Sequence, residues 1–178
     1  MSETKFWKYY VPSVDGIEGW GIFILDSTGM FSCVTDYGNY AFNWTYHGMN
    51  DFREFFTHDT NYDYHVHKLY RIGIQGDLEF HPEETVNFIK QSILESRWED
   101  HISEEGARKE WDLLDEIDWD NGPVSQQEWY DLTDLTDAHE YFVYDYPPRV
   151  KALRDKLLPR FAQILRKELE KESWIRIK

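Results

Sequence analysis

The stretch of residues 20–46, WGIFILDSTGMFSCVTDYGNYAFNWTY, constrains the fold more than any other part of this 178-residue chain. It contains three apolar segments of strand length separated by two turn signals. Residues 26–29 favour a type I turn with Gly29 in the left-handed position, and Gly38-Asn39 tolerates the positive φ that a two-residue hairpin turn requires. We therefore predict an antiparallel meander with strands over 5–11, 20–26, 30–37 and 40–46.

The last of these strands has one apolar face that other elements must cover. Tyr40, Phe42, Trp44 and Tyr46 alternate with small or polar residues, which is the two-residue period of a strand with one buried face. Downstream segments with helical spacing are expected to supply the cover. They lie over 51–57, over 82–98, from residue 103 onward, over 126–133 and over 149–172.

Local signals indicate where these helices begin and which faces they bury. Asn50 and Ser125 are suitable N-cap residues, and Pro82 suits the first position of a helix. Pro159 lacks an amide hydrogen, so it is expected to kink or split the last helix. Apolar residues at helical spacing predict the buried face of the 82–98 helix: Val86, Ile89, Ile93 and Leu94.

These patterns predict an α+β fold, in which an N-terminal antiparallel meander of about four strands packs against C-terminal helices. The length favours a single domain. We expect it to comprise a β-meander (1–47), an acidic helical region (48–147) and a basic amphipathic C-terminal helix (148–178). Cys33 is the only cysteine, so no intramolecular disulfide is expected, and neither a signal peptide nor a membrane span is expected.

The net charge of −15 is distributed in blocks. Residues 149–178 carry ten Lys and Arg against four Asp and Glu, a net charge of +6. Residues 99–145 carry sixteen Asp and Glu, with only Arg108 and Lys109 as bases, a net charge of −14. This excess of acid argues against direct binding of nucleic acid. The basic helix could pack beside the acidic block as a counter-charge, which we favour, or form a separate contact such as a homodimer interface.

The acidic block suggests a surface that imitates a nucleic-acid backbone, because phosphates are also regularly spaced negative charges. Aromatic side chains within the block would serve as anchors at the contact. The alternative is a solvated helix face that keeps the protein soluble. The residues expected to bind are seven carboxylates and one indole: Glu104, Glu105, Asp112, Asp115, Glu116, Asp118, Asp120 and Trp119.

A cluster of imidazoles and carboxylates offers a second hypothesis, a metal-dependent enzyme. A His-x-His pair on a strand places two imidazoles on one side, a spacing that metal sites use. The competing interpretation is a solvated polar loop. The candidate ligands are His58, Asp59, Asp63, His65 and His67. The polar tip of the hairpin is a weaker candidate site, since Asp36 before Gly-Asn and the flanking tyrosines are explained by turn chemistry.

The hairpin region also resembles a known group of proteins. The pattern GW-x5-D-x2-G-x6-DYGNY-x3-W, spanning residues 19–44, and the segment DFREFF (51–56) resemble small uncharacterised phage and prophage proteins. The resemblance covers about the first third of the chain. It implies a phage or prophage context, and therefore a partner in the host cell. The single cysteine fits a reducing cytoplasm, so we expect the protein in the cytoplasm of that cell.

The sequence contains no motif of the common hydrolases or nucleotide-binding enzymes. The chain has no Gly-x-Ser-x-Gly element, no phosphate-binding loop and no dinucleotide fingerprint, so we expect no cofactor and no catalytic residues. The leading hypothesis is a non-enzymatic, phage-encoded inhibitor that occludes a basic, nucleic-acid-binding site on a host or defence protein. The alternatives are the metal-dependent enzyme and a structural phage component.

Overall fold

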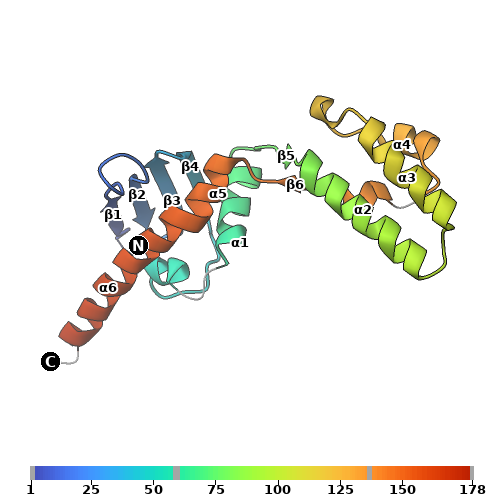
Figure 1. The fold of residues 1–178 in the computed structure, drawn as a ribbon. Coiled ribbons are helices and arrows are strands. Elements are labelled where there is room, and N and C mark those ends of the chain that lie inside the picture. The colour runs from blue at the N-terminus through green and yellow to red at the C-terminus, as the bar shows by residue number, and fades with distance from the viewer. Residues whose placement is uncertain (1–2, 58–60, 136–137, 177–178) are drawn as a thin grey trace. The chain divides into compact units, whose positions relative to one another are not determined.

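The computed structural model describes residues 3–57, 61–135 and 138–176, and the chain divides into two compact units. Residues 1–77 and 146–178 form the sheet unit. Residues 78–145 form the acidic unit (Figure 1). A four-stranded antiparallel sheet followed by helices is an α+β arrangement, so the predicted fold class is confirmed. The expectation that the whole chain behaves as one domain stays a prediction.

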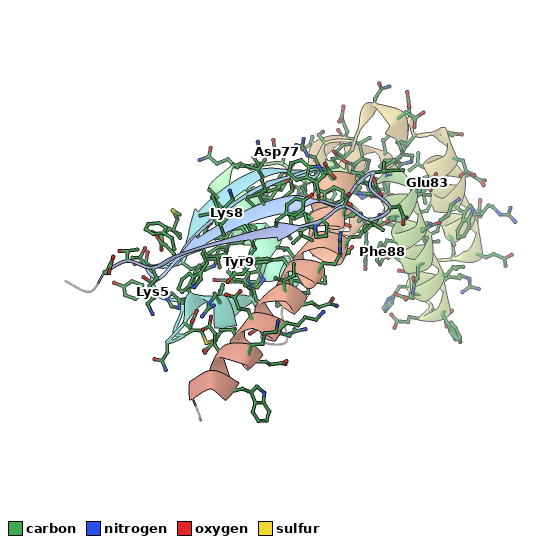
Figure 2. All side chains as sticks on the ribbon, turned by 90° about the vertical axis from the view of Figure 1, so that its left-hand side faces the viewer. Lys5, Lys8, Tyr9, Asp77, Glu83 and Phe88 are labelled. Carbon is green, nitrogen blue, oxygen red and sulfur yellow. The ribbon has the colours of Figure 1, made fainter. Side chains whose placement is uncertain are left out.

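The sheet is a meander in which each strand pairs with the next along the chain. Its strands are β1 (Phe6–Val11), β2 (Gly21–Asp26), β3 (Met30–Thr35) and β4 (Gly38–Asn43). Tyr9 pairs with Phe23, Phe23 with Cys33, and Cys33 with Tyr40. These four side chains are buried and follow the two-residue period of one sheet face, whereas Lys8 beside Tyr9 is exposed on the other face (Figure 2).

The two turns of the meander differ in how well the sequence predicted them. Gly29 has a φ of 97°, as expected for the turn after β2, and an added Cβ would lie 2.3 Å from the carbonyl oxygen of Trp44. The second turn was predicted at Gly38-Asn39, but it lies two residues earlier. Thr35 pairs with Gly38, so Asp36 and Tyr37 form the turn, and Gly38 enters β4 with a φ of 120°. Thr35 fixes this register by donating its hydroxyl to the Gly38 carbonyl at 2.8 Å.

Helices from the two chain segments of the sheet unit cover the buried face of the sheet. They are η1 (Phe52–Phe56), α1 (Tyr62–Val66), η2 (His67–Gly73), α5 (Pro148–Ala152), η5 (Leu153–Leu157) and α6 (Leu158–Arg176). Phe161 of α6 is fully buried, and its ring stacks on Phe23 at 4.2 Å between centroids. Tyr46 was predicted to face this core, but it lies beyond the end of β4 and is 98% exposed.

Pro159 perturbs the last helix in the predicted manner. The π-helical turn η5 immediately precedes α6, which begins one residue before the proline. A proline cannot donate to the carbonyl four residues earlier, and a π-turn is one way for a helix to absorb that loss.

The acidic unit has its own small core. Its main helices are α2 (Pro82–Trp98), α3 (Glu104–Glu116) and α4 (Gln126–Leu132). The short helix η3 (Trp119–Asn121) lies between α3 and α4 in the chain, and η4 (Ala138–Tyr141) follows α4. The strands β5 (Glu79–Phe80) and β6 (Tyr144–Asp145) pair at its ends. Its buried apolar residues are Ile89, Ile93, Leu114, Trp119 and Trp129. Leu94, predicted to point inward, is 58% exposed.

Hydrogen-bonded caps fix where the helices begin. Ser125 and Glu128 form a reciprocal capping box at α4, and Ser103 accepts from the Gly106 amide at α3. The hydrogen bond from Ser125 lowers the pKa of Glu128. The cap of η1 is Asp51, whose carboxylate accepts from the Arg53 amide, and not Asn50 as predicted.

Candidate protein-binding surface

The charge of the chain is segregated by structural unit. The acidic unit contains twenty Asp and Glu against four Lys and Arg, a net charge of −16. The sheet unit contains fourteen Asp and Glu against fifteen Lys and Arg, a net charge of +1. The 68 residues 78–145 therefore account for the entire net charge of −15, because the sheet unit changes it by only +1.

Helix α3 separates its charged residues from its apolar ones. Ser103 fixes its first turn, and Ala107, Glu110 and Leu114 recur at three- and four-residue spacing on its inner side. Five of the predicted binding residues occupy its opposite, exposed side: Glu104, Glu105, Asp112, Asp115 and Glu116. The helix therefore presents these five carboxylates together on one face, which we call the α3 carboxylate face.

Few of these carboxylates are neutralised within the protein. Asp115 accepts from Lys90 at 3.2 Å. In the described part of the chain, no ion pair joins Glu104, Glu105, Asp112 or Glu116 to a cation. Lys109, on the same helix, pairs instead with Asp134 at 3.2 Å. The face thus keeps most of its negative charge available to a partner.

Glu110 has a different role from its neighbours on α3, because it is buried. Its carboxylate accepts from the Asp134 amide at 2.9 Å and from the Thr133 hydroxyl. Both donors follow α4 in the sequence. Glu110 therefore fastens the end of α4 to α3, which shows that an acidic run does not by itself reveal which carboxylates are structural.

The remaining three predicted residues lie just after α3. Asp118 and Asp120 are exposed, and Asp118 caps η3 by accepting from the Asp120 amide at 3.2 Å and from the Asn121 side chain at 2.6 Å. Trp119 is buried, with its indole N–H donating to the Leu114 carbonyl at 3.1 Å. Its ring is thus a core element that supports α3, and it is not on the surface as an anchor would be.

The structure separates the candidate metal ligands. His58 and Asp59 lie outside the described residues. The segment from Tyr62 is helical and not a strand, so His65 and His67 point about 200° apart around the helix axis. Asp63 is exposed and pairs with Arg154 at 2.7 Å. No group of three or more His, Cys, Asp or Glu within 3–57, 61–135 and 138–176 is arranged to hold a metal ion.

His65 is instead enclosed by aromatic rings. Its ring stacks on Phe56 at 4.9 Å and meets Phe55 edge-on at 5.2 Å. Neither ring nitrogen has a hydrogen-bond partner, and only 3% of the residue is exposed. Burial lowers the pKa of His65 from 6.5 to about 4, because the charged form would lose its hydration without gaining a partner.

We expect this histidine to make the sheet unit acid-sensitive. Between pH 6.5 and 4 the unfolded chain binds a proton that folded His65 rejects, so stability is complete above pH 6.5 and falls as the pH falls to 4. A shift of this size corresponds to about 3 kcal/mol. The His65→Leu variant should lose this component of the pH dependence of urea unfolding, while the exposed-site control His67→Gln should keep it. Identical pH profiles for His65→Leu and the unmodified protein would contradict the assignment.

A cluster of charged groups around Arg53 is not predicted by the sequence. Arg53 of η1 is 3% exposed and binds three carboxylates: Asp51, Glu168 and Glu172. Its guanidinium also lies 4.9 Å from the centre of the Trp7 ring. Hydrogen bonds, those with Glu172 above all, raise the pKa of Arg53. Two of the three carboxylates lie on α6, more than 110 residues away in the sequence, so no local pattern could reveal the cluster.

Two arginines of the basic C-terminal segment bind groups that lie within the sheet unit. Arg154 binds Asp63 and Asp155, and Arg160 donates to the carbonyls of Gly19 at 2.7 Å and Pro12 at 2.5 Å. These arginines therefore hold the loop after β1 and helix α1 in place. The favoured hypothesis of a counter-charge for the acidic block stays a prediction.

The hairpin tip and Cys33 are explained by structure alone. At the hairpin tip, Asp36 accepts from the Trp20 amide at 3.2 Å, and the Tyr40 hydroxyl donates to the Tyr37 carbonyl at 2.6 Å. These contacts stabilise the turn. Burial raises the pKa of the Cys33 thiol to about 12, so this cysteine is suited to packing and not to nucleophilic chemistry.

Comparison with known proteins gives one match. A family model described as a phage family covers residues 1–167, well beyond the N-terminal third that carries the hairpin pattern. Neither the search of curated proteins nor the search of solved structures returned a match. Within the described ranges, no helix combines the length and apolar character that a bilayer span requires.

Proposed function

The chain belongs to this phage family, and from that premise we propose that it is an interaction protein that inhibits a partner of its host. The acidic unit would bind a basic surface on a host or defence protein. The bound surface would normally hold DNA or RNA, so inhibition would be by occlusion. No chemical step is needed for this mechanism.

The observation that carries the proposal is the confinement of the net charge to one unit. A charge of −16 within 68 residues, beside a sheet unit of +1, imposes self-repulsion that solubility of the whole protein does not require. Such a field attracts a basic surface over several ångströms and accelerates the encounter with it. Nucleic acid attracts the same surfaces by the same long-range force.

Within the acidic unit, we assign the contact to the α3 carboxylate face together with Asp118 and Asp120. These side chains are exposed, and α3 is a rigid support because its N-terminus is capped and its buried side is tied to α4 through Glu110. Trp119 is left out of the contact because its ring is in the core.

The test compares two variants with equal changes in charge. Variant one neutralises four residues of the α3 carboxylate face: Glu104→Gln, Glu105→Gln, Asp112→Asn and Glu116→Gln. The control neutralises four exposed carboxylates of the sheet unit: Glu3→Gln, Asp15→Asn, Asp77→Asn and Glu170→Gln. Each protein is used to capture partners from host lysate at low salt, and the captured protein is then identified and purified.

We expect variant one to associate with the purified partner at least about tenfold more slowly than the unmodified protein at low salt, because it loses electrostatic steering. The control should stay within about twofold. The unmodified protein should also displace DNA or RNA from the partner. The proposal would be refuted if the affinity did not change with ionic strength, or if the association rate fell equally in the two variants.

A further inference from the structure

A groove between α2 and α3 borders the α3 carboxylate face but differs from it in chemistry. Its volume is about 240 Å³. Its walls are apolar and consist of Ile93, Leu94, Ala107 and Trp111. Leu94 is 58% exposed, so the groove offers an apolar side chain that the acidic unit leaves more than half uncovered.

The rim of the groove holds two of the four cations in the acidic unit. These are Arg97 and Arg108, and Glu104 is the third charged residue of the rim. Arg97 pairs with Asp100 at 3.1 Å, but this pair is exposed and such pairs are weak. Among the described residues, no carboxylate forms an ion pair with Arg108, although acids surround it on α3.

The other two cations of the unit do not line the groove. Lys90 lies 4.9 Å from the centre of the Trp111 ring and pairs with Asp115. Lys109 pairs with Asp134. Lys90 therefore holds the Trp111 wall in place, whereas the two rim arginines keep hydrogen-bond donors that a ligand can use.

We infer that this groove is a specificity pocket that takes an apolar side chain and a neighbouring carboxylate of the partner protein. The inference rests on the proposed function and deepens it. A surface that only imitated nucleic acid would gain nothing from cations, because a DNA-binding site presents few carboxylates. Guanidinium groups beside an apolar wall instead favour a ligand that is apolar and anionic at once.

The groove and the carboxylate face would then contribute differently to binding. The carboxylates accelerate the encounter with any basic surface, and their effect weakens with salt. A buried apolar anchor with a paired arginine slows dissociation and selects one partner among many basic proteins. Glu104 belongs to both features, so a single partner surface can reach both.

The test uses a small probe that carries the required chemistry. The probe is 1-anilinonaphthalene-8-sulfonate, in which a sulfonate stands in for the carboxylate and the rings for the apolar side chain. The matched probe is N-phenyl-1-naphthylamine, which has the same rings and no charge. Binding to the full chain is followed by dye fluorescence and by the NMR shift of the Trp111 indole N–H.

We expect the anionic dye to bind at least about tenfold more tightly than the neutral one, although the net charge of the protein is −15. Arg108→Gln and Leu94→Gln should each weaken anionic dye binding about fivefold or more. Lys109→Gln removes the same charge from the same helix outside the groove and should change binding by less than twofold. Both altered groove residues are exposed, so the variants should fold, which far-UV circular dichroism checks.

Equal affinity for the two dyes would overturn the inference. An equal loss of affinity for the anionic dye in Arg108→Gln and Lys109→Gln would also overturn it. An unchanged Trp111 signal at saturating dye would also overturn it. The probe does not require the proposed partner. A failed capture experiment with normal dye binding would therefore count against the proposed function alone, and the reverse result would count against the pocket alone.

Discussion

Replacing Trp129 with alanine is expected to unfold the acidic unit while the sheet unit keeps its structure. Trp129 is fully buried and contacts Trp119 and Phe142 in the small core of the acidic unit. Truncating a buried tryptophan costs about 3–5 kcal/mol. A unit of this size has about 3–10 kcal/mol of stability in total, so the loss removes at least about a third of it and, toward the lower end of that range, all of it.

Hydrogen exchange measured by mass spectrometry can follow the two units separately. Peptides from α2 and α3 should lose protection in Trp129→Ala, and peptides from β2 to β4 should retain it. Trp98 provides the control, because it is 89% exposed on α2, and Trp98→Ala should change stability by about 0.5 kcal/mol or less. A uniform loss of protection would show instead that the chain unfolds as the single cooperative domain that its length suggests.

Replacing Arg53 with methionine is expected to destabilise the sheet unit by about 3 kcal/mol. Methionine fills much of the same space, but it removes the guanidinium that Asp51, Glu168 and Glu172 share. It also removes the guanidinium from the Trp7 ring. The two glutamates are more than a third exposed, and water limits their repulsion, so we expect a value at the lower end for buried ion pairs.

Urea unfolding of the sheet unit measures this effect. Arg53→Lys keeps the charge but not the fork that binds three carboxylates, so it should lose about half as much stability. Arg154→Ala is the control, because both carboxylates that Arg154 binds, Asp63 and Asp155, are more than half exposed, and such pairs should contribute about 1 kcal/mol or less each. If Arg53→Met lost no more stability than Arg154→Ala, the cluster would not be the link between η1 and α6 that its geometry indicates.

Local signals in the sequence were sufficient for much of the fold. The 82–98 helix begins and ends where Pro82 and the apolar spacing predicted. Ser103 and Ser125 cap the helices that follow them. The four strands lie close to the predicted ranges because alternation and turn residues act over a few positions. The hairpin turn was misplaced because the Gly38-Asn39 signal competes with hydrogen bonds that Thr35 makes across the turn.

The candidate site was predicted less completely, for a physical reason. Exposure of the α3 carboxylates follows from helical spacing, which the sequence displays. The burial of Trp119, Glu110 and His65 depends on which elements pack together. The amino-acid type of each residue allows both a buried and an exposed position, so no local rule distinguishes them.

By itself, the sequence determined the strands, the helix caps and the excess of negative charge in residues 99–145, because each depends on neighbours within a few positions. Only the tertiary structure decided that this charge belongs to a unit with its own core, with α3 presenting its carboxylates and a groove with two arginines beside them. It also decided that Arg53 meets glutamates more than 110 residues away. These features arise from packing between distant segments, and the free energy of such contacts is not encoded in any one stretch of the chain.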